Sequence, residues 1–405
     1  MSPKNSDGCG RAFPKPALAA FAALVLLAAD GGAPADAPEQ PRRIQKRAEI
    51  LWTRVICAEE GRYIGWPSVC RLACGDVVAV FSGDRDGHVC PWGKVQMVRS
   101  TDGGETWGPP KTVASTILDD RDAGIVQMPD GELILTWFTS VAYRHECFAA
   151  DHPEYRRHDG KLDKKAAADA LGYFLSRSRD NGVTWSPPRK LAHCEQTPHG
   201  PVLLKDGSLL QIGRRFEKSG GAGGGKERTV ISVSRSTDAG RTWEVLCGEV
   251  PSDDGGMDRS DLYHEPHVAE LADGTLVGLV RCHAADGCMR GTVSKDGGRT
   301  WSPMTKTPMH GLPPHLLALP CGKLVCVYGR RDADPGFGEF ACISDDGGRT
   351  WDVASEICLA PSHCGDLGYP ASALLADGAI LTVFYQQPRP GVKPCLMATK
   401  WRVSE

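Results

Sequence analysis

The most constraining feature of this sequence is an eight-residue pattern, Ser-x-Asp-x-Gly-x-Thr-Trp, that recurs five times without a mismatch. An aspartate side chain bonds backbone groups two residues on, and glycine adopts positive φ without steric cost, so each copy predicts a tight turn. Threonine favours re-entry into a strand, and tryptophan is a large apolar anchor for the turn. The chain is therefore an array of one supersecondary unit, and we interpret these turns as scaffold rather than as catalytic groups. The copies are Ser100–Trp107, Ser178–Trp185, Ser236–Trp243, Ser294–Trp301 and Ser344–Trp351.

A second repeat gives the number of units. Six times, an apolar strand leads into a turn with glycine and then into another apolar strand; the glycines are Gly75, Gly131, Gly207, Gly274, Gly322 and Gly378. The intervals of 56, 76, 67, 48 and 56 residues suit four strands per unit plus loops, which is the period of propeller blades. We therefore predict an all-β fold, a six-bladed β-propeller with five box turns. The last blade has no box after its glycine, so we expect Ile50–Ala58 to supply its outer strand and close the ring.

The N-terminal end resembles an export signal. Residues 16–29 form an apolar run of 14 residues behind Lys4, Arg11 and Lys15, and small residues follow. This pattern is typical of a signal peptide, and the run is too short for a comfortable membrane span. We predict a signal peptide over residues 1–35, a linker over 36–49 and one propeller domain over 50–405. The expected localisation is secreted or periplasmic, with a membrane anchor as the alternative if the signal is not cleaved.

Composition excludes several classes of partner. A net charge of −3 gives no case for nucleic acid or an anionic membrane surface. Removal of Cys9 with the signal would leave 15 of the 16 cysteines, an odd number at irregular spacings, so we expect mostly buried thiols and no zinc site. No cofactor is expected. Two insertions interrupt the repeats, Tyr143–Leu171 with a short helix predicted at Lys164–Leu171, and the glycine-rich Ser219–Lys226.

Candidate site residues emerge when the six units are aligned on their glycines. The strand before each glycine is expected to be the innermost of its blade, so that its first residues meet at one mouth of the central channel. Nine residues before the glycines lie Trp66, Asp122, Pro198, Glu265, Pro313 and Tyr369, and beside this ring lie His199, His264, His267 and His315. The strand after each glycine ends in arginine in four blades, at Arg85, Arg214 with Arg215, Arg281, and Arg330 with Arg331. Arginine binds carboxylates through two parallel hydrogen bonds, so the set predicts a site for a small anionic ligand.

These residues resemble the sialidase (neuraminidase) superfamily of six-bladed propellers, and the five turns look like its Asp boxes. The resemblance covers roughly Arg54 to Arg402. Gly368–Ser372 looks like the segment with the family's catalytic tyrosine, and the segment from Glu265 to Arg281 looks like the one with its glutamate and a binding arginine. The resemblance implies Tyr369 as nucleophile, Glu265 as the group that activates it, and Arg281 with Arg330 or Arg331 as binding arginines.

The chain departs from the family pattern in blade one. Gly65-Trp66-Pro67 stands where the family has Arg-Ile-Pro, and Arg85 is the candidate that would compensate. Asp84, Asp86 and Asp122 are candidates for the acid/base aspartate, and the register favours Asp122. The further candidates for substrate contact are Trp66, Asp366, His199, His264, His267 and His315. Metal ligation by His264-Glu265-Pro266-His267 is not expected, because Pro266 indicates a strand and paired histidine ligands of this kind need a helix.

The expected function is a sialidase-like exo-glycoside hydrolase that removes a terminal, acidic sugar from a glycan or glycoconjugate. Tyrosine is the nucleophile that such enzymes use beside a substrate carboxylate. A glycosidase for another sugar class, or a carbohydrate-binding propeller without activity, are the alternatives.

Overall fold

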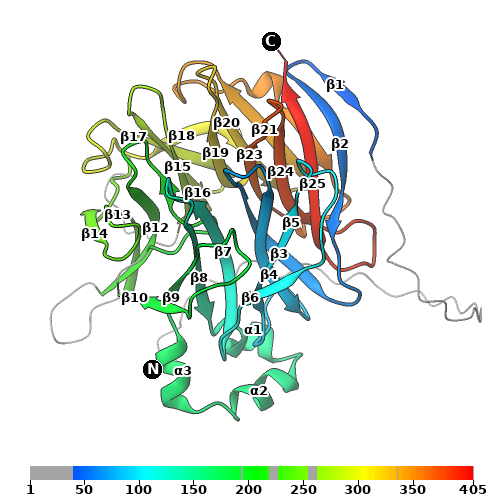
Figure 1. Cartoon of the computed structure of the whole chain (residues 1–405), viewed down its shortest axis with the longest axis vertical. Helices are drawn as coiled ribbons and strands as arrows, with labels where there is room; N and C mark the ends of the chain where they lie inside the picture. Colours follow the sequence, from blue (N-terminus) through cyan, green and yellow to red (C-terminus); the bar gives the residue numbers. More distant parts are fainter. Residues whose placement is uncertain (1–39, 193–194, 219–226, 254–261, 335, 405) are drawn as a thin grey trace, which may run out of the picture.

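Six antiparallel sheets form a ring in the computed structural model, which describes residues 40–192, 195–218, 227–253, 262–334 and 336–404 (Figure 1). The predicted signal peptide and the insertion Ser219–Lys226 lie outside the described residues. Blade 1 contains β3 (Tyr63–Arg71), β4 (Val77–Arg85), β5 (Lys94–Ser100) and β6 (Lys111–Ala114). Blade 2 contains β7 (Asp119–Gln127), β8 (Leu133–Ser140), β9 (Tyr173–Ser178) and β10 (Arg189–Leu191). Blade 3 contains β11 (Val202–Leu203), β12 (Leu209–Lys218), β13 (Glu227–Ser236) and β14 (Glu244–Cys247).

The second half of the ring repeats the arrangement. Blade 4 contains β15 (Tyr263–Glu270), β16 (Leu276–Cys282), β17 (Cys288–Ser294) and β18 (Thr305–His310). Blade 5 contains β19 (Leu312–Ala318), β20 (Leu324–Arg330), β21 (Gly338–Ser344) and β22 (Ile357–Pro361). Blade 6 contains β23 (Leu367–Leu374), β24 (Ile380–Gln386), β25 (Cys395–Val403), β2 (Ala48–Cys57) and β1 (Arg43–Gln45). The first strand of each blade contacts its counterpart in a neighbouring blade, so the strands predicted to be innermost surround the axis. The all-β, six-bladed propeller prediction is confirmed.

The ring closes through the N-terminal strand, as the missing sixth box predicted. Strand β2 pairs antiparallel with β25, so that Ile50 lies opposite Trp401 and Thr53 opposite Thr399. Closure of this kind joins the two ends of the chain in one sheet and covers the outer edge of β25. The structure adds β1 outside β2 as a fifth strand. The linker expected over residues 36–49 therefore overlaps the sheet from residue 43 onward, because a three-residue strand carries no periodicity that marks it in the sequence.

Each box is the turn between the third and fourth strands of a blade. In the fourth box, the Gly298 amide donates to Ser294 Oγ at 2.9 Å, and the Thr300 amide and hydroxyl donate to the two oxygens of Asp296 at 2.9 and 2.6 Å. The buried Trp301 donates its indole N–H to Gly298 O at 3.0 Å. In this box the serine, aspartate, threonine and tryptophan side chains are therefore occupied within the turn itself.

The insertion in blade 2 is helical and supports a neighbouring loop. It contains the 3-10 turn Ala142–Arg144 and the helices α1 (Glu146–Ala149), α2 (Pro153–Asp159) and α3 (Lys164–Ala170), which project below the ring in Figure 1. The short helix predicted at Lys164–Leu171 is confirmed. Tyr155 packs edge-on against Trp92 at 5.6 Å and donates its hydroxyl to Val89 O at 3.0 Å, so the insertion holds the loop between β4 and β5.

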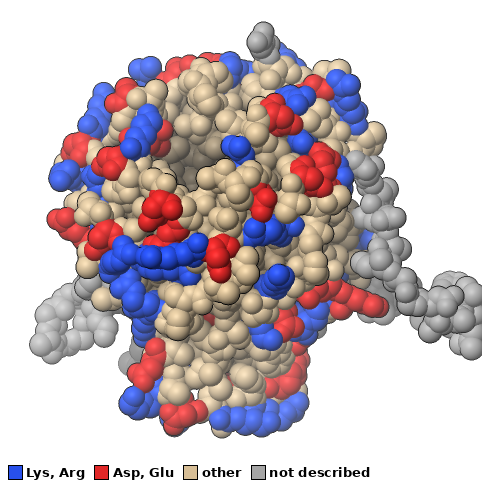
Figure 2. Space-filling view, in the orientation of Figure 1, with Lys and Arg blue, Asp and Glu red and all other residues tan. Residues whose placement is uncertain are grey.

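The surface charge, the cysteines and the helices were compared with what a charged partner, a disulfide framework, a metal site or a membrane span would require. Figure 2 shows Lys and Arg interspersed with Asp and Glu over the face in view, in keeping with the small net charge. Within the described ranges, all 14 cysteines are free thiols, and no group of three or more His, Cys, Asp and Glu side chains has the geometry to hold a metal ion. No helix of the described part of the chain is long and apolar enough to cross a bilayer.

Candidate active site

A β-bulge recurs at one register position of the inner strands and builds the site. The pairing of the first and second strands shifts there in five blades: between Gly65 and Ser68, Arg121 and Gly124, His264 and His267, Leu312 and His315, and Gly368 and Ala371. Four side-chain-bearing residues at this position have positive φ: Trp66 at 54°, Asp122 at 52°, Glu265 at 41° and Tyr369 at 53°. Such a conformation costs about 1–3 kcal/mol per residue and persists only where the surrounding structure enforces it. The bulges therefore re-aim the four predicted ring residues toward one mouth of the channel.

Tyr369, Glu265 and Arg281 form the centre of this ring. The Tyr369 hydroxyl donates to Glu265 Oε1 at 2.6 Å, and Arg281 is hydrogen-bonded and ion-paired with the other carboxylate oxygen. Arg281 Nη1 also lies 3.2 Å from the Tyr369 oxygen. Burial would raise the pKa of Glu265, but the charge of Arg281 and the hydrogen bonds from Tyr369 and Arg281 lower it to about 2. Burial and the adjacent Glu265 raise the pKa of Tyr369 well above its usual value. The resting pair is thus a carboxylate and a neutral phenol.

Asp122 faces the same mouth as a carboxyl group that can hold a proton at neutral pH. Its side chain is buried, and its Oδ1 has no hydrogen-bond partner among the described residues. Its backbone amide donates to Ser82 Oγ at 3.0 Å, which fixes the bulge. Burial raises its pKa to about 7, with Glu265 raising it further and Arg121 opposing the shift. A carboxyl group in this state can donate a proton near pH 7.

The other two aspartate candidates are engaged elsewhere. Asp84 lies 2.6 Å from Lys94 and 2.5 Å from Arg62, and its pKa is lowered because these cations outweigh the effect of burial. Asp86 is ion-paired with Arg62 at 2.5 Å. Neither carboxylate meets Tyr369, so the structure favours Asp122 among the three, as the register did.

Of the neighbouring pair Arg330 and Arg331, the structure brings only Arg331 to the tyrosine. The Arg331 guanidinium lies 5.4 Å from the Tyr369 ring centre and donates to Leu367 O and the Tyr385 hydroxyl, each at 2.9 Å. Arg330 instead donates to Glu356 at 2.6 Å and is buried in its own blade. Adjacent residues of an extended chain face opposite sides, so only one of two consecutive arginines can reach the channel.

Arg85 lies beside Trp66, with its guanidinium 5.0 Å from the ring centre, but it is held in a buried ion pair. It is fully buried, and its two terminal nitrogens bond both oxygens of Asp119, the second at 2.9 Å. A fully desolvated, doubly hydrogen-bonded pair of this kind is a structural element, because breaking it would strand a buried charge. The expectation that Arg85 replaces the missing blade-one arginine is therefore not met by its placement.

An aromatic wall stands beside Tyr369. Trp66 is buried and contacts Tyr369 edge-on at 6.2 Å, Tyr63 at 5.8 Å and Tyr385 at 5.7 Å. The predicted Asp366 accepts a hydrogen bond from the Tyr63 hydroxyl at 2.7 Å, which places it at the edge of this wall.

Two residues of the site escaped the sequence analysis. The Arg121 guanidinium lies 4.2 Å from the Trp66 ring centre, and the His88 ring lies 4.8 Å from it. The sequence signal for Arg121 was its place directly before Asp122. His88 lies in the loop after β4, which the alignment on the turn glycines does not cover, so no sequence signal marked it.

The predicted histidines separate into two groups. His264 lies near the arginines: its Nδ1 is 2.8 Å from Arg214, and its ring is 4.5 Å from His283, which accepts a hydrogen bond from Arg281 at 2.8 Å. His199, His267 and His315 instead lie deeper in the channel, with ring centres 4.2 to 5.7 Å apart.

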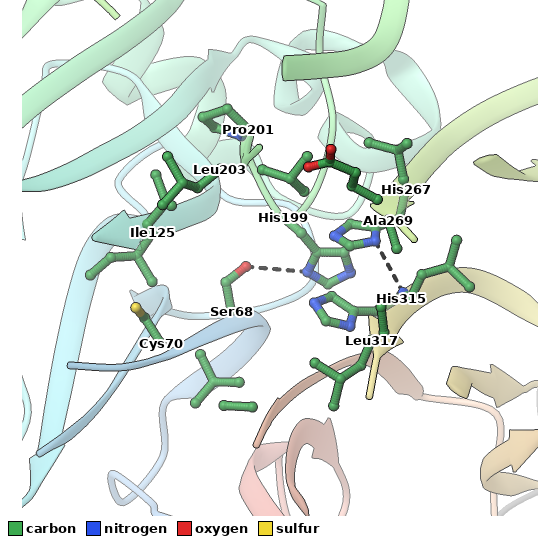
Figure 3. A pocket seen from close by; sticks show the side chains of 18 of the residues that line it. Ser68, Cys70, Ile125, His199, Pro201, Leu203, His267, Ala269, His315 and Leu317 are labelled. Atoms are coloured by element: carbon green, nitrogen blue, oxygen red, sulfur yellow. Dashed lines mark hydrogen bonds between the residues drawn. The ribbon is translucent and has the colours of Figure 1, made fainter. Parts of the chain in front are cut away.

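The deeper group forms the end of a cavity of about 440 Å³ (Figure 3). Ser68 Oγ is 3.2 Å from His199 Nδ1, and the Leu316 amide donates to His267 Nδ1 at 3.0 Å. Burial lowers the pKa of His199 to about 4 and that of the other two well below the usual value. The cavity is lined by later residues of the inner strands, so these neutral rings separate it from the ring of Tyr369, Glu265 and Asp122.

Comparison with known proteins agrees with this architecture. The family model described as a BNR repeat-like domain matches residues 78–382. A sialidase of Micromonospora viridifaciens is 28% identical over 320 residues, which are 72% of this chain and 43% of the relative, so the chain spans less than half of that protein.

Among solved structures, a Dyadobacter fermentans protein of unknown function aligns with a TM-score of 0.70 and 22% identity over 89% of this chain and 99% of its own. The NanB sialidase of Streptococcus pneumoniae aligns with a TM-score of 0.61 and 14% identity over 90% of this chain and 71% of its own. The chain therefore belongs to the BNR repeat-like domain family and is a six-bladed propeller of the sialidase superfamily.

Proposed function

We propose that the protein is an exo-acting glycoside hydrolase of the sialidase type that releases a terminal acidic sugar from a glycan. The observation that carries this proposal is the 2.6 Å hydrogen bond from Tyr369 to Glu265 beside Arg281, on bulges that also present Asp122. A scaffold has no use for four strained, buried polar or aromatic residues in register, whereas strain of this kind gathers at functional sites. The distant sialidase relative of Micromonospora viridifaciens supports the same reaction class.

The proposed first step transfers the sugar to the enzyme. The Tyr369 oxygen attacks the anomeric carbon as its proton passes to Glu265, and the bond from that carbon to the leaving oxygen breaks. Asp122 gives its proton to the leaving oxygen, so the aglycone departs as a neutral alcohol. In the second step Asp122 accepts a proton from a water that attacks the anomeric carbon, and Glu265 returns its proton to the departing Tyr369. Both steps balance in protons, and the stereochemistry at the anomeric carbon is retained.

Substrate binding itself would activate the nucleophile. With a pKa of about 2, Glu265 is a weak base while Arg281 is paired with it. A substrate carboxylate that competes for Arg281 would weaken this pairing and raise the basicity of Glu265. The Tyr369 proton could then move along the existing hydrogen bond. Activation would in this way depend on an anionic substrate, because a neutral sugar leaves the Arg281–Glu265 pair intact.

Substitution of the nucleophile tests the proposal. We expect Tyr369→Phe to lower turnover of a 4-methylumbelliferyl sialoside by at least about a hundredfold, because it removes the attacking oxygen and its proton relay. Tyr143→Phe is the matched control, since that hydroxyl bonds Asp159 within the helical insertion. Undiminished turnover by Tyr369→Phe would contradict the nucleophile assignment.

A wider substrate screen separates the alternative functions. Gly65 stands where the family has a binding arginine, which favours testing acidic sugars other than sialic acid as well. We would offer 4-methylumbelliferyl sialoside, glucuronide and neutral hexosides side by side. Release of glucuronic acid alone would assign another sugar class, and the absence of release from every glycoside would favour a carbohydrate-binding propeller.

A further inference from the structure

The blade-one position from which the family's first arginine would extend is filled by aromatic rings in this protein. A Cβ atom added to Gly65 would already lie 3.3 Å from the Tyr63 ring and 3.7 Å from the Tyr385 ring. Both rings pack with Trp66 in one core cluster, so a longer side chain at Gly65 would have to displace them. An anion that binds beside Tyr369 must therefore be held by a guanidinium from another part of the ring.

Arg121 is placed to supply that guanidinium. It lies on β7 directly before the bulge at Asp122, with its charge 4.2 Å from the Trp66 ring centre. Its nearest carboxylate oxygens, on Asp119 and Asp122, are 3.8 and 3.9 Å away, which is beyond hydrogen-bond distance. Among the residues that the structure describes, the Arg121 side chain makes no hydrogen bond, and 11% of it remains exposed. Its donors are therefore held in place by stacking and are not committed to a protein acceptor.

The neighbouring arginines differ in this respect. Arg281 donates to Glu265, Tyr369 and His283, Arg331 to Leu367 O and Tyr385, and Arg85 to Asp119. A guanidinium has five N–H donors, and an unused set beside a solvent-reached mouth is what a carboxylate requires for two parallel hydrogen bonds. The N–H donors of Arg121 are thus the ones in this part of the site that can bind a ligand carboxylate without breaking a hydrogen bond to the protein.

His88 marks where the positive charges converge. Its side chain is 48% exposed, contacts the Trp66 ring edge-on and lies 2.9 Å from the Tyr63 hydroxyl. Partial desolvation at the mouth lowers the pKa of His88 from its usual value, and the charges of Arg121, Arg331, Arg85 and Arg281 act in the same direction. A neutral imidazole among four guanidinium groups can donate a hydrogen bond to an anion there without being its counter-charge. Geometry and charge therefore indicate the same place, in front of Trp66 and between Arg121 and Arg331.

We propose that Arg121, from blade 2, replaces the absent blade-one arginine and binds the carboxylate of the acidic sugar while stacked on Trp66. This inference rests on the proposed function for the nature of the ligand, and it assigns the residue that distinguishes an acidic from a neutral sugar. The substrate class is an acidic monosaccharide whose carboxylate reaches Arg121 while its anomeric carbon lies at Tyr369, because Arg121 flanks the proposed acid Asp122.

Binding of matched acid and ester probes tests this inference without any turnover. The probes are N-acetylneuraminic acid and its methyl ester, and D-glucuronic acid and its methyl ester, titrated against the full chain by ligand-observed NMR. We expect the unmodified protein to bind one acid at least tenfold more tightly than its ester. Arg121→Gln should weaken binding of that acid by roughly ten- to hundredfold, the range for loss of charged hydrogen bonds, and leave the ester nearly unchanged. Arg121→Lys should recover part of the preference because it keeps the charge.

The control variant is Arg402→Gln, which removes the same charge from an exposed ion pair with Asp377, in the turn that lies at the other end of β23 from Tyr369. It should bind acid and ester as the unmodified protein does. Retention of the full acid-over-ester preference in Arg121→Gln would overturn the inference, as would an unmodified protein that binds acid and ester equally. Thermal unfolding of each variant shows that the fold is retained.

Failure of this inference and failure of the proposed function give different results. If the protein binds the acid through Arg121 but Tyr369→Phe does not change turnover, the carboxylate site stands and the nucleophile is wrong. If Tyr369→Phe abolishes turnover but Arg121→Gln keeps the acid preference, the hydrolase stands and Arg121 is not its carboxylate ligand.

Discussion

The three channel histidines predict that this fold is destabilised by mild acid, and His199 allows the size of the effect to be worked out. Burial lowers its pKa from 6.5 to about 4, and the titratable groups that face it are His267, His315 and Glu265. The unfolded chain therefore binds this proton more strongly than the folded chain. Its contribution to stability is complete above about pH 6.5 and is lost as the pH falls toward 4.

The magnitude follows from the two pKa values. At pH 5 the unfolded histidine is almost fully protonated and the folded one almost fully neutral, so the loss from His199 alone is about 2 kcal/mol. Below pH 4 it approaches about 3 kcal/mol, the free-energy equivalent of the difference between the two pKa values. His267 and His315 add losses in the same direction, because burial depresses their pKa values as well. The unfolding free energy should thus fall steeply between pH 6.5 and pH 5.

Urea unfolding at pH 8 and pH 5 measures this loss, and His199→Asn isolates one histidine. The asparagine amide keeps a polar group near Ser68 Oγ but does not titrate. Any constant cost of the substitution cancels when the two pH values are compared within each variant. We expect the fall in unfolding free energy from pH 8 to pH 5 to be smaller by about 2 kcal/mol in His199→Asn than in the unmodified protein.

An exposed histidine provides the matched control. His363 lies at the surface with its Nε2 3.2 Å from Gln387, and His363→Asn should follow the unmodified protein at both pH values. The reasoning is refuted if His199→Asn loses as much stability between pH 8 and pH 5 as the unmodified protein does.

Two further substitutions separate catalysis from scaffold. Because burial raises the pKa of Asp122 to about 7, hydrolysis should fall as the pH rises through that value, and Asp122→Asn should lower kcat by roughly 10²–10⁴-fold and abolish this limb of the pH–rate profile. The profile of kcat against pH checks this, and a variant that keeps the limb would exclude Asp122 as the acid. Arg85→Gln should cost about 3–5 kcal/mol in urea unfolding, because it leaves the fully buried Asp119 carboxylate without its partner. A variant as stable as the unmodified protein would show that this ion pair is not structural.

Repeated turns made the fold predictable from the sequence. The six glycines and five boxes fix the number of blades because each demands a particular backbone conformation, and the absent sixth box pointed to closure by an N-terminal strand. Strand β1 could not be predicted, since Arg43–Gln45 is too short to show alternation and its one apolar residue, Ile44, is exposed. Structural elements that recur in every blade could thus be predicted from the sequence, whereas an element that occurs once, such as β1, could not.

The candidate site was predictable to the same extent. Trp66, Asp122, Glu265 and Tyr369 were found because the bulge places them at one repeated distance from the turn glycines. The same alignment could not distinguish arginines that face the channel from arginines in structural ion pairs. It gives the place of a residue along the strand, but not the partner that its long side chain reaches. Arg330 accordingly bonds Glu356 within blade 5, and Arg85 bonds Asp119 of the neighbouring blade 2.

Arg121 was overlooked for a related reason. It precedes the aligned position by one residue, and its approach to the channel depends on the bulge and on stacking with Trp66 from the neighbouring blade. Contacts between blades join segments distant in sequence, so no repeat within the chain signals them.

The pairing that closes the ring also determines at which stage of chain synthesis the propeller can close. Ile50 of β2 pairs with Trp401 of β25. Strand β2 is therefore synthesised early, and its partner β25 is synthesised only after almost all of the domain. During this interval β2 has no neighbour on the side that β25 will occupy, and an unpaired strand edge readily pairs with another chain. A chain truncated before β25 would therefore aggregate through unpaired strand edges instead of folding into a smaller closed propeller.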